Sequence, residues 1–463
     1  MIIGRKTMLR DVNMLSGKIL PELLKFAFPV ILTGVLQQLY NTADNIVVGQ
    51  FGGEVALAAV GATTSIINVL VTVFINIFVG TNILVARSKG AGDNEMLKKI
   101  VATTYVIALV LGFTLLIVGE VLAETMLRLT NCPEEVLPGA LKYLRIYFIG
   151  IPASMITNFG ASVIRNLGDS KTPFVFLSLS GIINVVLNVV LVLIFGDPVA
   201  SVAIATVAAM LVSAAMFVYY MCRINGPCRL HLFKFRFHAN VFIKTIKYGI
   251  PSIISSVSFS LTNVIIQPAI NDYGAIGISA STAASSIEAY LYAINNSFMA
   301  AVVAFVGQNI GAGNRERVGK VLKTSYLTVI VAMAFYTAFI IGLGRELLWI
   351  FLPGNPEAIE FARFRMAIIM SAAMVNGVMN VNAGALQAYG YTILQMISNL
   401  VGVCAFRLLW MEFVYPYYKN PFMLWIAYPI SWVVTAIAIF VIVMIITYKY
   451  KHNIGLKKLN KSI

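Results

Sequence analysis

The stretch Lys89-Gly90-Ala91-Gly92-Asp93-Asn94 returns as Ile310-Gly311-Ala312-Gly313-Asn314-Arg315, 221 positions later. Four further pairs keep an offset of 222: Phe28-Pro29-Val30-Ile31 with Ile250-Pro251-Ser252-Ile253, Asn41 with Asn263, Gly52 with Gly274, and Asn166-Leu167-Gly168 with Ala388-Tyr389-Gly390. Matches that hold register over nearly half the chain are not accidents of composition. They indicate an internal repeat, which in a membrane protein is typical of transporters whose substrate site lies between the copies.

The composition indicates a membrane protein. Hydrophobic residues make up 59% of the 463 residues, charged residues only 11%, and the mean hydropathy is +0.86. A soluble domain carries about 25% charged residues. Apolar stretches long enough to cross a bilayer, which takes about 20 residues, recur along the chain. They predict twelve transmembrane helices, at about 20–50, 56–84, 97–119, 138–163, 171–195, 198–222, 240–270, 277–305, 318–342, 358–386, 390–414 and 422–448.

The net charge of +15 is distributed as membrane topology requires. Most Lys and Arg residues fall in alternate connections and at the termini, as the positive-inside rule predicts for the cytoplasmic face. We therefore expect a multi-pass protein of the cell (inner) membrane with both termini in the cytoplasm, and no nucleic-acid partner. Residues 1–19 contain charges and no apolar core, which indicates a cytoplasmic amphipathic segment rather than a cleavable signal peptide.

The repeat predicts two lobes. Helices one to six form an N-lobe over 20–222, a basic cytoplasmic linker covers 223–239, helices seven to twelve form a C-lobe over 240–448, and a basic tail covers 449–463. Because six is even, both halves enter the bilayer in the same orientation, so the repeat is parallel. The prediction is an all-α membrane protein with two pseudo-symmetric six-helix bundles and a V-shaped central cleft.

Polar residues inside the apolar stretches fall on single helical faces. Gln37, Asn41 and Asp44, for example, are spaced i, i+4, i+7, which keeps them on one side of a helix. Such residues are costly in hydrocarbon and usually face a bundle interior or a watery cavity, although they also hold helices together. We predict a substrate cavity lined by Gln37, Tyr40, Asn41, Asn68, Phe159, Asn263, Gln267, Tyr292, Asn295, Asn376 and Asn380.

Two carboxylates lie deep in the predicted spans, Asp44 and Glu288. In a low dielectric a carboxyl group favours its neutral form, which makes it a natural proton carrier. With amide and hydroxyl oxygens nearby it can instead hold Na⁺, a hard cation that takes oxygen ligands as Ca²⁺ does. The structural alternative is a protonated carboxyl satisfied by one hydrogen bond. Pro29 and Pro251 each remove one helical hydrogen bond and are predicted to kink helices one and seven.

Taken together, these features resemble the multidrug and toxic compound extrusion (MATE) family over nearly the whole chain. The resemblance rests on the order of motifs of which none is decisive alone: Pro29, Asn41-Thr42-Ala43-Asp44, Gly90-Ala91-Gly92, Arg165-Asn166-Leu167-Gly168-Asp169, Ala205-Thr206 and Gly307-Gln308-Asn309-Ile310-Gly311-Ala312-Gly313. It implies a cation-coupled antiporter that expels amphipathic, often cationic, compounds by alternating access. It implies no cofactor beyond the coupling ion, H⁺ in preference to Na⁺.

The resemblance also implies a site. Carried over residue by residue, the cation site would be Asp44, Asn184, Asn188 and Thr206. Many relatives with a proton-type N-lobe have an Asp where this chain has Asn188, which leaves Asp44 as the sole acid there. One branch places acids where this chain has Phe259 and Asn376, so Glu288 becomes the second candidate acid. We expect small amphipathic organic substrates, and a monomer in the lipid bilayer.

Other functions fit the sequence less well. A flippase for lipid-linked saccharides, from the same broader superfamily, is the alternative. Its cavity would be cationic, whereas the cavity predicted here holds almost no intramembrane cations, with Arg407 as the exception. An enzyme would need a nucleophile with a base or a metal cluster, and His231, His238 and His452 all lie in basic segments. The four cysteines have no metal or redox spacing. An ATP-driven pump would need a phosphate-binding Gly-x-x-x-x-Gly-Lys-Ser/Thr loop, which the sequence lacks. A transporter of the major facilitator type would have a charged Gly-x-x-x-Asp-type loop after helix two, which is also absent from the sequence. A channel would not require two lobes with buried acids.

Overall fold

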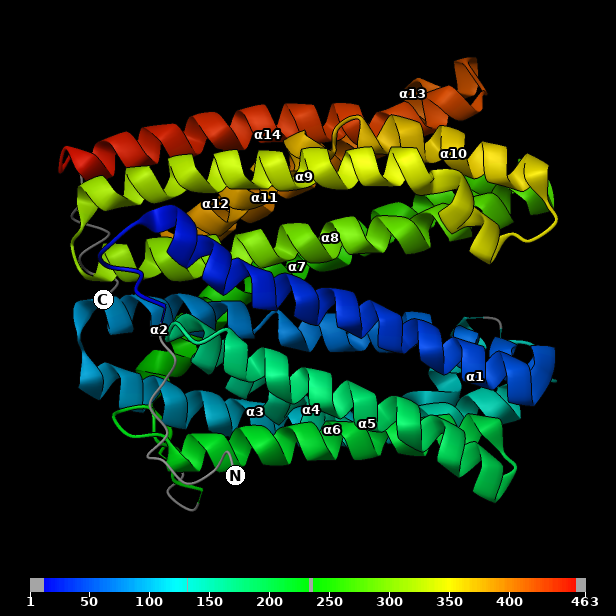
Figure 1. Cartoon of the computed structure of the whole chain (residues 1–463), viewed down its shortest axis with the longest axis horizontal. Coiled ribbons are helices and arrows are strands. Elements are labelled where there is room, and N and C mark those ends of the chain that lie inside the picture. The colour runs from blue at the N-terminus through cyan, green and yellow to red at the C-terminus, as the bar shows by residue number, and fades with distance from the viewer. Residues whose placement is uncertain (1–11, 131, 233–235, 455–463) are drawn as a thin grey trace. The chain divides into compact units, whose positions relative to one another are not determined.

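The structure is a computed structural model that describes residues 12–130, 132–232 and 236–454. Within these residues the secondary structure is helical throughout, without a strand (Figure 1). The first half contains α1 (Ile19–Ile75), α2 (Phe78–Ala91), α3 (Asn94–Leu129), α4 (Leu137–Asn166), α5 (Lys171–Phe195) and α6 (Pro198–Arg223). The second half contains α7 (Ala239–Asn271), α8 (Gly274–Gly311), α9 (Arg315–Phe351), α10 (Pro356–Met370), α11 (Ala373–Ala388), α12 (Thr392–Asn399), the π-helix η1 (Leu400–Ala405), α13 (Phe406–Phe413), the 3₁₀ turn η2 (Tyr415–Tyr417) and α14 (Pro421–Lys451).

These elements confirm the twelve predicted spans. The long α1 contains the first span and most of the second, which ends in α2, because Gly53 interrupts α1 with φ 69° and ψ −167°, a conformation open to glycine. Conversely, α10 with α11 forms one span, and α12, η1 and α13 form another. Ten described segments are long and apolar enough to cross a membrane, with α1 and α2 taken as one and α10 and α11 each too short to count alone. The chain is therefore a multi-pass membrane protein.

The described chain divides into two compact units. The first unit contains residues 12–13 and Phe28–Gly249, and the second contains Met14–Ala27 and residues 250–454. These limits differ from the predicted lobe edges, because each unit includes the start of the first helix of the other sequence half. Both divisions fall one or two residues before a proline, Pro29 in α1 and Pro251 in α7.

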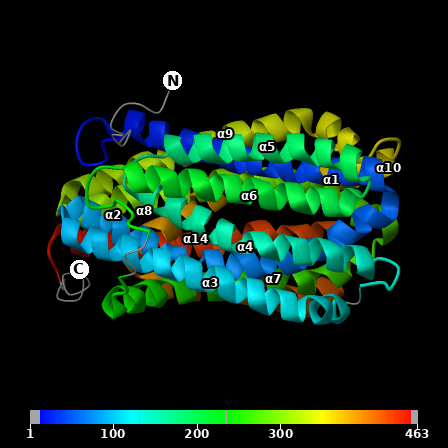
Figure 2. The same cartoon turned by 90° about the horizontal axis from the view of Figure 1, so that it is seen from below.

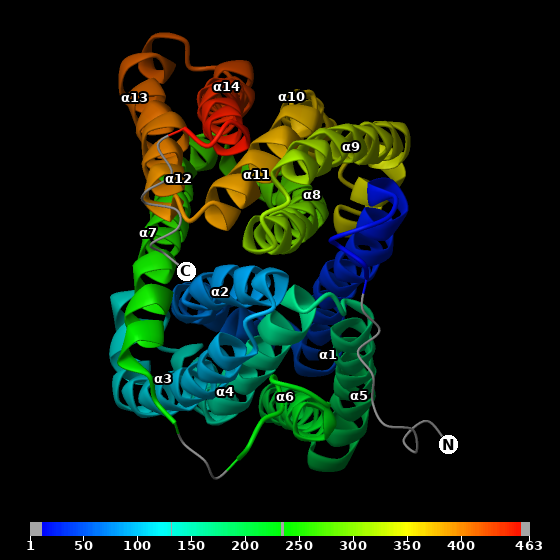
Figure 3. The same cartoon turned by 90° about the vertical axis from the view of Figure 1, so that its left-hand side faces the viewer.

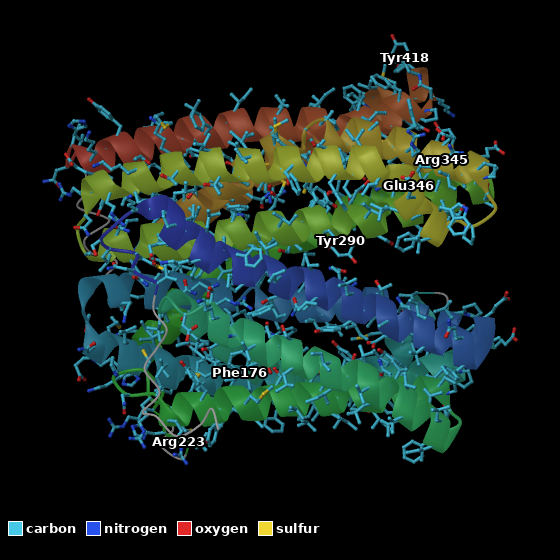
Figure 4. The ribbon with its side chains drawn as sticks, viewed as in Figure 1. Phe176, Arg223, Tyr290, Arg345, Glu346 and Tyr418 are labelled. Atoms are coloured by element: carbon cyan, nitrogen blue, oxygen red, sulfur yellow. The ribbon has the colours of Figure 1, made fainter. Side chains whose placement is uncertain are left out.

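The first unit is a bundle in which α4 packs against α3 and α6, and α5 packs along α6 (Figure 2). Phe176 on α5 meets the rings of Phe217 and Tyr220 on α6 edge-on, at 5.2 and 5.7 Å between centroids (Figure 4). The start of α7 belongs to this bundle: Gly80 on α2 lies so close to Thr245 that an added Cβ would stand 2.2 Å from the Thr245 carbonyl oxygen. Burial of these apolar surfaces fixes the helices around the polar site described below.

The second unit packs α8 against α9, α10 and α11, with α14 along α10 and α11 (Figure 3). One end of this unit carries Arg345 and Glu346 on α9 and Tyr418 beyond α13 (Figure 4). The segment before α1 is also part of this unit. The Arg317 guanidinium donates to the carbonyls of Met14, Ser16 and Gly17 at 2.8–3.1 Å, and Asn309 donates to Met14 as well.

The repeated motifs of the sequence are helix ends. Gly92 and Gly313 have φ of 68° and 72°, Gly168 and Gly390 have 112° and 74°, and Gly53 and Gly274 have 69° and 64°. Left-handed glycines at these places satisfy the last carbonyls of a helix and reverse the chain. Their recurrence at offsets of 221 or 222 confirms the internal repeat. The predicted terminal segments at 1–19 and 449–463 lie largely outside the described residues, although residues 12–18 are seen to be non-helical and α14 extends to Lys451.

Candidate functional site

A half-buried carboxylate marks the first unit. Asp44 lies in α1, nine residues before the break at Gly53, and its Oδ1 accepts a hydrogen bond from Asn188 Nδ2 of α5. Asn188 is completely buried, and Asn184 one turn earlier is 5% exposed. The described part of the chain shows no cation paired with this carboxylate. A carboxylate held by a neutral amide and no counter-ion is suited to take up a cation or a proton.

The other two members of the predicted set lie beside each other. Asn184 Nδ2 donates to Thr206 Oγ1 at 3.3 Å, and the Thr206 hydroxyl in turn donates to the Val202 carbonyl at 2.9 Å. Thr206 comes from α6, so the set joins α1, α5 and α6. The stacked rings of Tyr143 and Tyr147 on α4, with centroids 6.3 Å apart, pack on the same apolar cluster as Val202.

One atom of this set is left without a partner. Asn188 Oδ1 is buried and accepts no hydrogen bond from the described residues. A buried polar atom without a partner costs free energy, and a ligand bound beside Asp44 would supply one. Carboxylate, amide and hydroxyl oxygens are donors that a hard cation prefers, and the Asp44 carboxylate equally accepts a proton. The residues therefore have the chemistry to hold either Na⁺ or a proton. No cluster of three or more His, Cys, Asp or Glu residues is present over the described ranges.

Tyr40, predicted to line the cavity, lies one turn before Asp44. Its hydroxyl donates to the Ser178 carbonyl of α5 at 3.1 Å. Its ring occupies the space that Gly181 leaves open, since a Cβ on Gly181 would stand 1.8 Å from Tyr40 Cε2. The contact fixes α1 against α5 at the level of the carboxylate, so it positions Asp44 relative to Asn188.

In the second unit Glu288 has a partner that sequence analysis missed. Arg365 of α10 donates through Nε and Nη2 to both Glu288 carboxylate oxygens, at 3.0 and 2.8 Å, and through Nη2 to Ser285. Both charged side chains are nearly buried, at 5–6% exposure. The Arg365 guanidinium also lies 4.4 Å from the Trp425 ring centroid. The signal was available: Arg365 falls inside the predicted span 358–386, where a charge needs a partner.

Three predicted cavity amides form a cluster of their own. Asn295 of α8 and Asn380 of α11 both donate to Asn376 Oδ1, at 2.7 and 3.1 Å. Asn295 and Asn376 are 1% and 2% exposed. The structure thus brings together α8 and α11 by hydrogen bonds between side chains. This is the interhelical role that polar residues often have in membranes.

The remaining predicted cavity residues have separate surroundings. Phe159 is 1% exposed and packs against Tyr105, and the Tyr292 ring meets Phe259 edge-on at 6.3 Å. Gln267 donates to Asn271 one turn later. Gln37, Asn41, Asn68 and Gln267 are exposed and Asn263 half-buried. That these residues share one substrate cavity stays a prediction.

A separate cavity of about 600 Å³ lies in the second unit, between the end of α7 and the α13–η2 segment. None of the residues that were predicted to line the substrate cavity contributes to it. It is lined by Ile265, Pro268, Ala269, Asp272, Leu408, Leu409, Met411, Glu412, Phe413, Tyr415, Pro416 and Lys419.

Known proteins resemble this chain in sequence and in fold. The chain is 25% identical over 424 residues to "Probable multidrug resistance protein YoeA" of Bacillus subtilis, covering 90% of this chain and 91% of that protein. It is 23% identical to a protein named "FAD transporter" in Shewanella oneidensis, covering 84% and 86%. A structure described as the outward-facing conformation of a multidrug resistance MATE family transporter of the MOP superfamily superposes with a TM-score of 0.88 at 20% identity, covering 96% of this chain and all of that one.

The family assignment follows from a match to both halves of the chain. The model of the MatE family matches residues 29–190 and again residues 251–410, in register with the internal repeat. The two matches together cover more than half of the chain and include Asp44, Asn184, Asn188 and Glu288. They confirm the resemblance on which the predicted cation site rests, and they assign the chain to transporters rather than enzymes. This chain belongs to the MatE family.

Proposed function

We propose that this protein is a cation-coupled antiporter that exports small amphipathic, often cationic, organic compounds in exchange for a proton. The observation that carries the proposal is the Asp44 carboxylate, held by Asn188 without a counter-ion, beside the unpartnered Asn188 Oδ1. The name of the relative in Bacillus subtilis supports drugs as cargo. The relative named FAD transporter adds other small organic molecules to the candidate cargo.

The mechanism that we propose couples the ion to the cargo through Asp44. In the outward-facing state the carboxylate takes a proton, or binds Na⁺ together with Asn184, Asn188 and Thr206. Neutralising the charge lowers the affinity for a cationic compound, which leaves. The ion-loaded protein then favours the inward-facing state, releases the ion and binds new cargo. Ion and cargo need only differ in their affinity for the two states for exchange to occur.

The proposal also covers the membrane in which the protein lies, its orientation there and its oligomeric state. The basic connections favour a cell (inner) membrane protein with both termini in the cytoplasm, and we propose that it works as a monomer. Reporter fusions after Lys451 test the orientation: we expect a reporter that is active only in the cytoplasm to function there.

Everted membrane vesicles, into which an exporter carries a fluorescent cationic dye added outside, test the coupling. A proton gradient and a sodium gradient are imposed separately, and wild-type protein is compared with Asp44→Asn. We expect the proton gradient to drive transport, and Asp44→Asn to reduce the rate about tenfold or more, within the usual range of coupling between two ligands.

The matched control is Glu135→Gln, an exposed acid between α3 and α4, which should transport as wild type does. Undiminished transport by Asp44→Asn would remove Asp44 from the mechanism. Transport driven by the sodium gradient alone would make Na⁺ the coupling ion.

A further inference from the structure

A second buried cation lies in the second unit. Arg407 of α13 is 0% exposed, and its Nε donates to Ser431 Oγ of α14 at 3.0 Å. Its two terminal nitrogens, Nη1 and Nη2, are buried and donate to no atom of the described residues. Guanidinium groups carry five donors in a fixed fork, so most of the hydrogen-bonding capacity of Arg407 is unused.

Aromatic rings surround this guanidinium. The Arg407 Cζ lies 3.9 Å from the centroid of the Tyr428 ring, 5.8 Å from Phe259 and 5.9 Å from Trp432. Cation–π contacts of this kind stabilise a desolvated cation. They supply no acceptor for the Nη1 and Nη2 protons, however, and a buried charge without a hydrogen-bonded partner is costly. The aromatic rings therefore stabilise the buried guanidinium but leave Nη1 and Nη2 without a hydrogen-bond acceptor.

No carboxylate neutralises Arg407 over the described ranges. The nearest candidate, Glu288, gives both its oxygens to Arg365. The other groups that face Arg407 electrostatically are the hydroxyls of Tyr428 and Tyr292 and the thiol of Cys404, none of which is a carboxylate. Two guanidiniums and one carboxylate thus leave one uncompensated positive charge in this part of the second unit.

The backbone before Arg407 is unusual as well. The π-helix η1, Leu400–Ala405, ends two residues before it. Such π-helical turns are rare and frequently occur at functional sites. At Gly402 the turn approaches α14 so closely that a Cβ would stand 2.2 Å from Thr435 Oγ1. The turn brings α13 against the helix that carries Tyr428, Ser431 and Trp432.

We propose that Arg407 is the binding point for an oxyanion, a carboxylate or a phosphate, of a small aromatic compound carried by this protein. Nη1 and Nη2 match the two oxygens of such a group bidentately, and the rings of Phe259 and Trp432 suit its apolar body. Because Arg407 is fully covered here, the oxyanion enters when the unit opens locally next to η1. The inference rests on the proposed transport function, since it names a class of cargo.

Isothermal titration calorimetry on the purified full-length protein in detergent tests the site with three probes. These are 2-naphthoate, 2-naphthyl phosphate and the neutral 2-naphthamide, which share one ring system. We expect at least one of the two anions to bind and the amide not to bind, and the tighter anion identifies the oxyanion. Arg407→Gln should weaken that binding about tenfold or more, because charge-assisted hydrogen bonds are lost. Arg407→Lys, which keeps the charge without the fork, should fall between.

The matched control is Arg363→Gln, because Arg363 is an exposed arginine on α10 that pairs with Glu360. The affinity of the Arg363→Gln protein for the anion should equal that of wild type. A saturating anion should raise the Tm of wild type and of Arg363→Gln, but not that of Arg407→Gln. Equal binding of naphthamide and the anions, absence of binding by both anions, or unchanged affinity in Arg407→Gln would each overturn the proposal. If Arg407→Gln does not fold, unchanged affinity in Arg407→Lys overturns it.

The outcome is separable from that of the proposed antiport, because this binding needs no ion gradient. A protein that fails to export a cationic dye but binds 2-naphthoate through Arg407 contradicts the antiport proposal alone. A protein that exports the dye through Asp44 but binds neither anion contradicts this inference alone.

Discussion

At the scale of single residues, the two copies of the repeat differ in the charged side chains that they hold within the predicted spans. The first unit holds the half-buried acid Asp44 against the Asn188 amide, with no cation paired to it among the described residues, whereas the position 222 residues later is Ile266, 1% exposed. The second unit buries Glu288 already paired with Arg365, and adds Arg407 without an acid. The symmetry of the helices therefore does not extend to the side-chain chemistry: among the described residues, Asp44 has no cationic partner, whereas Glu288 is paired with Arg365.

The Glu288–Arg365 pair leads to a prediction about stability. Removing one partner of a buried ion pair leaves an unpaired charge and costs roughly 3–5 kcal/mol. Glu288→Gln should therefore lower the free energy of unfolding by about that amount, while Glu288→Gln combined with Arg365→Met should recover most of the loss. Thermal unfolding followed by tryptophan fluorescence measures both.

Glu360→Gln is the control for this prediction, because Glu360 pairs with Arg363 at the surface and such pairs contribute about 1 kcal/mol or less. A Glu288→Gln protein as stable as Glu360→Gln would show that the buried pair is not structural. Glu288 would then be free to act as the second coupling acid.

At the scale of elements, the contact between α1 and α5 sets the geometry of the cation site. The Tyr40 ring fits only because residue 181 is glycine, and Asp44 and Asn188 follow one to two turns further along the same two helices. A glycine inside a helix costs roughly 0.5–1 kcal/mol relative to alanine. The close approach of the ring offsets that cost and fixes the distance between the two helices.

Gly181→Ala should accordingly harm both stability and function. The added methyl group overlaps Tyr40, and overpacking of this kind costs about 1–3 kcal/mol. We expect a lower Tm and weaker ion-driven transport, both partly restored in Tyr40→Ala/Gly181→Ala. Gly61→Ala is the matched control, since a Cβ there meets no atom within 4 Å; it should be neutral or stabilising. Equal Tm values for the two alanine variants would contradict the argument.

At the scale of the whole molecule, each unit includes the beginning of the first helix of the other half of the sequence. Met14–Ala27 belongs to the second unit and residues 239–249 to the first. Arg317 secures the former through three main-chain carbonyls, and the close contact between Gly80 and Thr245 secures the latter. Each unit is thus completed by a segment from the other half of the chain.

The exchange predicts that the protein survives cleavage between the halves. Co-expressed residues 1–232 and 233–463 should copurify from membranes, because each fragment completes the unit of the other. Arg317→Ala removes three hydrogen bonds from a charged donor, each worth about 1.5 kcal/mol or more, and should lower the copurified yield markedly. Lys320→Ala, an exposed residue one turn away, should not. Fragments that purify separately would contradict this account.

The sequence by itself determined the class, the repeat and the first-unit site. Hydropathy fixed twelve spans, recurring glycines marked the same helix ends in both halves, and the spacing of Asn184 and Asn188 together with the motif at Asp44 identified residues that do lie together. These features are local or periodic, and local properties can be read along a chain.

Only the tertiary structure decided which residues far apart in the sequence lie next to each other. The pairing of Glu288 with Arg365 spans 77 residues, the Arg317 contact with Met14 spans 303, and the unit boundaries next to Pro29 and Pro251 divide helices that the sequence shows as continuous. Periodicity assigns a side chain to a face of its helix, but not the helix that the face meets. That choice depends on how the whole bundle excludes lipid and satisfies its buried charges, so the open carboxylate and the unpartnered guanidinium emerged only from the folded units.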